Sequence, residues 1–211
     1  MKLKPATTAL VLINVLVALI GLWPGAMNVM LPAAAFIPAR IFGSAAMFGE
    51  AATLIPVWLT PFTASFIHLG WFDLLWPFLL LLLLGNALEM SIGSRAIVIL
   101  YFGGALSSAV ALTVVAGGSA EPFTGSFNAV SAIIGCYLML QTPLVQQYWM
   151  NLSGRNSRLL QLTALWFVIN IAWNLYMPWD QIVPLVASAM AAFIFGCLAA
   201  EPLHRWYKRT A

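Results

Sequence analysis

The sequence predicts an all-α integral membrane protein, because its composition is apolar throughout and its apolar residues fall into long stretches. Hydrophobic residues make up 63% of the 211 residues, charged residues only 7%, and the mean hydropathy is +0.96. Soluble domains carry about 25% charged residues, and a helix needs about 20 apolar residues to cross a bilayer. Six stretches approach this length: residues 8–23, 71–88, 96–115, 126–140, 159–174 and 182–200. We therefore expect six transmembrane helices in one compact bundle, and a single domain over residues 1–211.

The first stretch follows the residues MKLK and has the general appearance of a secretory signal peptide. Cleavage after Ala26 would place Pro24 where signal peptidase needs a small side chain, and five further apolar stretches follow. We therefore expect the first stretch to stay in the protein as an uncleaved transmembrane helix.

The connection between the first two stretches, residues 24–57, is long and contains only two charged residues, Arg40 and Glu50. Irregular backbone at membrane depth must be covered by protein, so an apolar connection of this length has to fold. We expect short amphipathic helices that lie at the outer membrane interface, with Trp58 as an aromatic anchor. A small soluble domain outside the membrane is the alternative.

Four phrases around the second, third and fourth stretches occur in a characteristic order. Residues 66–78 read FIHLGWFDLLWPF, the pattern Gly85, Glu89 and Gly93 follows, residues 95–109 read RAIVILYFGGALSSA, and residues 125–140 read GSFNAVSAIIGCYLML. Over residues 59–141 the chain resembles the rhomboid family of intramembrane serine proteases. The resemblance implies a rhomboid-like bundle of six transmembrane helices with an interfacial helical loop between the first and second.

The resemblance also assigns the catalytic positions of the family, a serine in the fourth span and a histidine in the sixth. At the position of the family's serine this chain has Phe127, and at that of the histidine the best register places Ala189. A phenyl ring can neither attack a carbonyl nor be activated by a base. No histidine occurs between His68 and His204. We therefore expect no protease activity.

Two further positions in the second span supply hydrogen-bond donors to the oxyanion in the family, a histidine and an asparagine. Here Asp73 and Pro77 stand at these positions. An ionised aspartate repels an oxyanion, and proline has no side-chain donor, so the resemblance implies that this function is lost as well.

Ser126 and Ser188 lie one residue from Phe127 and Ala189, so a shift of one residue in the alignment has to be considered. Such a shift rotates a helical side chain by roughly 100°, which turns it away from the position of its neighbour. His68 is then the only possible base near the outer face, and we expect its ring to bind loop backbone. For Glu89 we expect backbone hydrogen bonds from the turn that follows it.

The fifth span carries two amides one turn apart, Asn170 and Asn174, near Trp166 and Trp173. Amides in a membrane helix usually bond within the bundle, which is the first interpretation. In rhomboids the second and fifth spans frame the lateral opening through which a substrate helix enters. The second interpretation is therefore a surface for a partner helix, formed by these four residues together with Trp76.

Small side chains predict close contact between the fourth and sixth spans. Ser131 and Gly135 lie four residues apart in one span, and Ala192 and Gly196 in the other. Small residues at this spacing let two helix backbones approach each other.

Cys136 and Cys197 both lie within apolar stretches, where a thiol behaves as a small hydrophobic side chain. We expect no disulfide, no metal site and no cofactor.

The basic residues predict the orientation. With six spans, all but Arg40 fall on one side: Lys2, Lys4, Arg95, Arg155, Arg158, Arg205, Lys208 and Arg209. Lys and Arg collect on the cytoplasmic side, so we expect a multi-pass protein of the inner (cytoplasmic) membrane with both termini in the cytoplasm. The net charge of +3 reflects this asymmetry, and the chain lacks the basic stripe of a nucleic-acid-binding protein.

Together these features predict a rhomboid-like pseudoprotease, a non-catalytic protein of the lipid bilayer that binds or regulates other integral membrane proteins through their transmembrane helices. An accessory or assembly subunit of a larger membrane complex is a first alternative. An intramembrane serine protease with relocated catalytic residues is a second.

Overall fold

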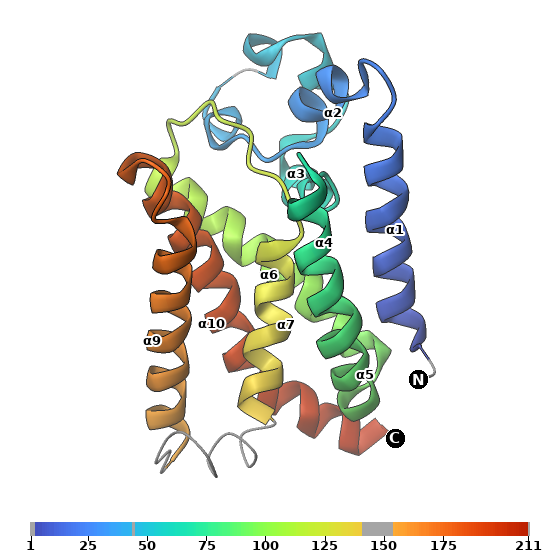
Figure 1. The fold of residues 1–211 in the computed structure, drawn as a ribbon, viewed down its shortest axis with the longest axis vertical. Coiled ribbons are helices and arrows are strands. Elements are labelled where there is room, and N and C mark those ends of the chain that lie inside the picture. Colours follow the sequence, from blue (N-terminus) through green and yellow to red (C-terminus); the bar gives the residue numbers. More distant parts are fainter. Residues whose placement is uncertain (1–2, 44, 141–153, 211) are drawn as a thin grey trace.

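The computed structural model describes residues 3–43, 45–140 and 154–210, and these form an upright bundle of helices (Figure 1). The long helices are α1 (Pro5–Gly21), α4 (Trp71–Leu80), α6 (Ser94–Ala116), α7 (Phe127–Leu140), α9 (Arg155–Asn174) and α10 (Trp179–Thr210). A π-helical segment, η5 (Leu81–Gly85), joins α4 to α5 (Asn86–Ile92). In the described part no strand is present beyond one isolated bridge between Phe36 and Phe123. The predicted all-α class is confirmed.

Each of the six apolar stretches coincides with a helix, but the helices differ in length and polarity. Three segments, Trp71–Ile92, Ser94–Ala116 and Trp179–Arg209, are long and apolar enough to cross a membrane, while α1 and α7 are apolar but shorter. Helix α9 begins with polar residues, since residues 155–158 read RNSR. The structure therefore supports a membrane protein with three clear spans, and six crossings stay a prediction.

The first helix begins and the last helix ends at the same end of the bundle (Figure 1). We call this the terminal end, and we call the opposite end, which carries residues 22–70, 117–126 and 175–178, the loop end. The described basic residues other than Arg40 belong to helices or turns at the terminal end, and Arg40 lies at the loop end. Lys2 lies outside the described residues. The charge asymmetry predicted from the sequence is therefore present in the fold.

The long connection folds into short helices at the loop end: α2 (Ala26–Ala34), η1 (Pro38–Ile41), η2 (Ala45–Phe48), η3 (Glu50–Thr53), η4 (Val57–Leu59) and α3 (Thr60–Ala64). Trp58 is 67% exposed. The segment thus has the expected short helices, and its location at a membrane interface stays a prediction.

Arg40 is buried within this segment and joins its parts through hydrogen bonds to the backbone. Its side chain is buried, and its guanidinium donates to the carbonyl oxygens of Pro32 (2.9 Å), Ala33 (3.3 Å), Ala52 (2.6 Å) and Ile55 (2.9 Å). These carbonyls belong to the last turn of α2, to η3 and to the turn after η3, where helix ends leave carbonyls without a helical donor. One buried cation therefore satisfies four backbone acceptors and joins the parts of this connection.

Glu89 of α5 fixes the first helix to the bundle. Its carboxylate accepts hydrogen bonds from the backbone N–H of Ala6 (3.0 Å) and Thr7 (2.8 Å), from Thr7 Oγ1 (2.7 Å) and from Ser94 Oγ (2.6 Å). The expectation of backbone donors from the following turn is wrong, because those donors come from the unpaired first turn of α1, where a negative charge is favourable. Only the Ser94 hydroxyl lies just after Glu89.

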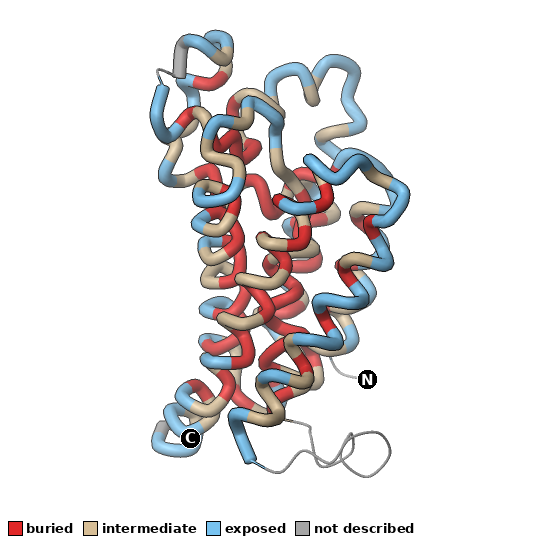
Figure 2. The backbone as a smooth tube through the Cα atoms, turned by 90° about the vertical axis from the view of Figure 1, so that its left-hand side faces the viewer, coloured by how far each residue is buried: buried red, intermediate tan, exposed pale blue. Residues whose placement is uncertain are grey.

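The core runs along the axis of the bundle between α6, α7 and α10, where red, buried backbone predominates in Figure 2. Gly135 of α7 and Gly196 of α10 face each other's helices. A Cβ atom on Gly196 would overlap the carbonyl oxygen of Ala132, and one on Gly135 would overlap that of Phe193. The predicted close contact between these two helices is confirmed, because glycine alone permits this approach.

Candidate functional site

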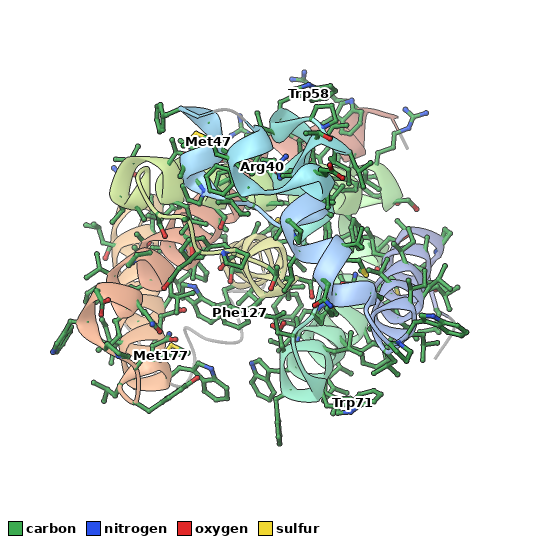
Figure 3. The ribbon with its side chains drawn as sticks, turned by 90° about the horizontal axis from the view of Figure 1, so that it is seen from above. Arg40, Met47, Trp58, Trp71, Phe127 and Met177 are labelled. Atoms are coloured by element: carbon green, nitrogen blue, oxygen red, sulfur yellow. The ribbon has the colours of Figure 1, made fainter. Side chains whose placement is uncertain are left out.

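A cavity of about 650 Å³ opens at the loop end between α4 on one side and the ends of α9 and α10 on the other. Figure 3 looks onto this end, where Phe127 lies centrally between Trp71 and Met177. Phe127 is the first residue of α7 and lines the inner part of the cavity. We call this space the Phe127 cavity.

The fold brings three of the four positions singled out by the resemblance to this cavity. Asp73 and Pro77 project from the first turns of α4, and Phe127 projects from α7, so that all three line the same space. Ala189 is buried within α10 and is not among the residues lining the cavity.

Phe127 belongs to a stack of three aromatic rings that runs into the core. Its ring centroid lies 6.0 Å from that of Trp166 in α9, and Trp166 in turn lies 5.1 Å from Phe193 in α10. The interplanar angles are 19° and 13°, so the rings are nearly parallel. The stack joins three helices below the cavity, and the ring of Phe127 gives the cavity an apolar floor.

The side chains of Ser126 and His68 form a hydrogen bond that the sequence did not predict. Ser126 Oγ lies 3.1 Å from His68 Nε2, and His68 Nδ1 lies 3.1 Å from the carbonyl oxygen of Phe66. A carbonyl can only accept, so Nδ1 carries the proton and Nε2 accepts from the Ser126 hydroxyl. The expected bond between His68 and loop backbone is confirmed.

The electrostatic environment keeps this histidine neutral. Burial lowers the pKa of His68, while the charge of Asp73 and the bond to the Phe66 carbonyl oppose this shift without cancelling it. A neutral imidazole oriented by a carbonyl and bonded to a serine hydroxyl has the separation found between a nucleophile and its general base.

The low solvent exposure of Ser126 and His68 distinguishes this pair from a catalytic dyad. Ser126 is 2% exposed and His68 5% exposed. Ser126 does not line the Phe127 cavity, in agreement with the rotation expected for a neighbour of Phe127. His68 borders a separate, mostly apolar cavity of about 350 Å³ between α1, α2 and α4, which Ser126 does not line either. The hydrogen bond therefore ties the loop before α4 to the start of α7.

Asp73 adds a second link between the same two loops. Its Oδ2 accepts a hydrogen bond from the backbone N–H of Leu69 at 3.0 Å. Its Oδ1 packs against Gly125, where a Cβ atom would lie only 2.8 Å away. Gly125 also has φ +99°, which L side chains rarely adopt. Glycine is therefore required here on two grounds.

The alternative serine of the sixth helix, Ser188, is fully buried and does not face the Phe127 cavity. Its hydroxyl donates to the carbonyl of Leu185 at 2.8 Å and accepts from the side-chain amide of Asn128 at 3.2 Å. Ser188 thus joins α10 to the first turn of α7.

The five residues expected to contact a partner fall into two groups. Trp76 and Trp173 are 47% and 59% exposed, and their rings stack across the mouth of the cavity at 5.9 Å. Trp166, Asn170 and Asn174 are buried inside the bundle. The amide of Asn170 donates to the carbonyl of Trp166 (2.9 Å), and that of Asn174 to the carbonyl of Asn170 (2.8 Å). The amides therefore bond within their own helix.

Among residues 3–43, 45–140 and 154–210, no three His, Cys, Asp or Glu side chains come together as metal ligands would. Cys136 and Cys197 are free and buried, and Cys197 Sγ lies 3.5 Å from the carbonyl oxygen of Gly135. The Phe127 cavity is lined by carboxyl, amide, hydroxyl and aromatic side chains.

Comparison with known families gives one match. The family model described as Rhomboid domain matches residues 56–205, a range that includes every residue lining the Phe127 cavity. No curated protein matches the chain.

Proposed function

Because this chain belongs to the rhomboid family of multi-pass integral membrane proteins, we propose that it is a non-catalytic member, a pseudoprotease that binds other membrane proteins through their transmembrane helices. One observation supports this proposal above all others. The position of the family's nucleophile is occupied by Phe127, whose ring is stacked on Trp166 at the floor of the cavity.

The surroundings of Phe127 support the same conclusion. Asp73 places a carboxyl group where an oxyanion would need a donor, and Pro77 offers no side-chain donor. Ala189, which stands in place of the family's histidine, has no proton to exchange. None of the side chains at the family's four catalytic positions can therefore serve as nucleophile, base or oxyanion donor.

We propose that all six long helices cross the inner membrane and that the terminal end faces the cytoplasm. The concentration of Lys and Arg at the terminal end supports this orientation. In this arrangement the short helices α2 to α3 lie at the outer interface, where the exposed Trp58 serves as an anchor.

The partner surface in this proposal is the seam between α4 and α9, represented by Trp76 and Trp173. Lipid tails are as apolar as leucine, so helices associate in a bilayer through close packing and hydrogen bonds. The two exposed indoles supply broad surfaces for packing. The bundle covers Trp166, Asn170 and Asn174. The two amides donate to backbone carbonyls of α9 and are not available to a partner.

The hydrogen bond between Ser126 and His68 favours a second candidate function, a protease with relocated residues. This candidate requires a substrate carbonyl to reach a hydroxyl that is 2% exposed and lines neither cavity. Pseudoprotease function requires no such opening, and we therefore favour it.

Photocrosslinking in native membranes tests the proposal. A benzoylphenylalanine placed at Trp76 or Trp173 is expected to capture membrane proteins, whereas the same probe at Val110, an exposed residue of α6, is not. Varied clients in small amounts support a client-binding pseudoprotease, and one partner in equal amount indicates a fixed subunit of a complex. Capture by Val110 alone would contradict the proposed surface.

A further inference from the structure

The Phe127 cavity is lined by two carboxyl groups and by no described basic residue. Asp73 projects into it from α4, and Glu121 lies at its rim in the loop before α7. Asp180, next to the lining residue Gln181, adds an exposed acid near the cavity. Charges of one sign around a cleft with low-dielectric walls produce a focused potential, here negative.

The described bases at the loop end do not neutralise this potential at the cavity. Arg40 is buried and bonded to four backbone carbonyls in the segment between α1 and α4, and it does not line the cavity. His68 is buried and neutral behind Asp73. The cavity is therefore attractive to cations and repulsive to anions.

The walls of the cavity are aromatic, which favours the same kind of ligand. Trp76 and Trp173 stack at its mouth, Phe127 forms its floor, and Trp71 and Tyr176 complete the walls. The faces of aromatic rings attract cations, and they also pack well against methylene groups. Such a site suits a positive charge at the end of an apolar stem.

We infer that the Phe127 cavity receives a Lys or Arg side chain from the outer flank of a partner transmembrane helix packed against α4 and α9. Long basic side chains near helix ends extend along apolar surface and place their charge at the membrane interface. The stem would lie on the indoles, and the charge would reach Asp73 and Glu121. This inference rests on the proposed function and names the partner's recognition element.

A basic side chain fits the site better than a lipid headgroup does. The ammonium group of a zwitterionic lipid is tethered to a phosphate a few atoms away, and no described base at the cavity would meet that phosphate. Asp73 and Glu121 would repel it. A Lys or Arg side chain brings no such anion.

The test uses the full chain in phosphatidylglycerol vesicles, with benzoylphenylalanine in place of Leu79, which is exposed on α4 one turn after Trp76. The probes are two synthetic helices of about 20 Leu and Ala residues. They differ only in one residue at the outer flank, which is Lys in one and Gln in the other. We expect the Lys helix to crosslink about three- to tenfold more than the Gln helix.

Asp73→Asn combined with Glu121→Gln is expected to reduce crosslinking of the Lys helix to the level of the Gln helix. Asparagine retains an acceptor for the N–H of Leu69, so the local fold is preserved. Glu50→Gln is the matched control, because it removes an exposed acid of the loop end that borders a different cavity. It is expected to leave the preference unchanged.

Four outcomes overturn the inference. Equal crosslinking of both helices refutes the charge preference and leaves the partner surface standing, whereas no crosslinking of either refutes the surface as well. A preference that survives the double substitution places the charge contact elsewhere. A preference that disappears when phosphatidylethanolamine is added to the vesicles assigns the cavity to a lipid headgroup.

Discussion

His68 Nε2 and Ser126 Oγ are 3.1 Å apart across two loops, with the second ring nitrogen of His68 held by a backbone carbonyl. Taken alone, this is the geometry of a nucleophile with its base. A catalytic pair must also be accessible to a substrate, and the burial of both side chains leaves no such path. The pair instead satisfies two buried polar groups and joins the loop before α4 to α7.

The purified protein is expected to resist labelling by fluorophosphonate probes, because the Ser126 hydroxyl is covered. In-gel fluorescence measures the labelling, with an active rhomboid as the positive control and Ser126→Ala as the matched variant. A signal that disappears in Ser126→Ala would contradict the pseudoprotease proposal.

Restoring the family's dyad by Phe127→Ser with Ala189→His is expected to leave the protein inactive on a generic rhomboid substrate. Asp73 and Pro77 still line the cavity in place of oxyanion donors, and one missing donor costs about 100-fold to 1000-fold in rate. Cleavage of a fluorogenic transmembrane substrate measures activity. Adding Asp73→His and Pro77→Asn is the comparison, and robust cleavage by the simple double variant would refute the role given to these two positions.

Substituting Glu89 by alanine is expected to destabilise the protein by about 3 kcal/mol or more, because several donors of α1 and α6 lose a buried charged acceptor. Unfolding in mixed detergent micelles measures the loss. Glu201→Ala is the control. Glu201 pairs with Arg155 and Arg205 at the exposed surface, and we expect its loss to cost at most about 1 kcal/mol.

Replacing Gly196 by alanine is expected to cost about 1–3 kcal/mol, because the added methyl group would overlap the carbonyl of Ala132 and force α7 and α10 apart. The thermal midpoint of unfolding in detergent measures this effect. Gly118→Ala serves as the control, since nothing lies within 4 Å of a Cβ atom there. Equal effects of the two substitutions would refute the close contact between the helices.

Stability is expected to fall as the pH is lowered below about 6.5, the ordinary pKa of histidine. The pKa of His68 is lower in the folded protein, mainly through burial, so the unfolded chain binds the proton more readily. The contribution of neutral His68 is complete above that pKa and is lost as the pH falls toward the folded value. Unfolding at pH 5 to 8 measures it, and His68→Gln is expected to reduce the slope. An unchanged slope would show that another group titrates.

The sequence predicts the helices well, because an apolar stretch in a membrane protein has few alternatives to a helix. It does not predict which face of a helix points inward. Trp166 and Trp173 lie two turns apart, yet one is buried and the other exposed. Lipid and protein interior are equally apolar, so hydrophobic periodicity carries little information about this difference.

The sequence also did not predict the contacts between segments that lie far apart along the chain. The partners of Glu89 in α1 lie 82 and 83 residues away, and Ser126 lies 58 residues from His68. No local pattern encodes such pairs, because they depend on how the loops pack at each end of the bundle. The composition of the Phe127 cavity, in contrast, was partly predicted, since the resemblance assigned Asp73, Pro77 and Phe127 to one functional region.

The stack of Trp76 on Trp173 has a consequence for how often the seam between α4 and α9 opens. Separating two stacked aromatic rings costs about 0.5–1.5 kcal/mol, so the ring contact alone would leave the seam open for roughly 7 to 30% of the time. A client helix would then select a conformation that already exists, and its apparent affinity would be weakened by about three- to fourteen-fold. The two indoles would thus keep the seam closed most of the time, and thermal motion alone would open it to a partner.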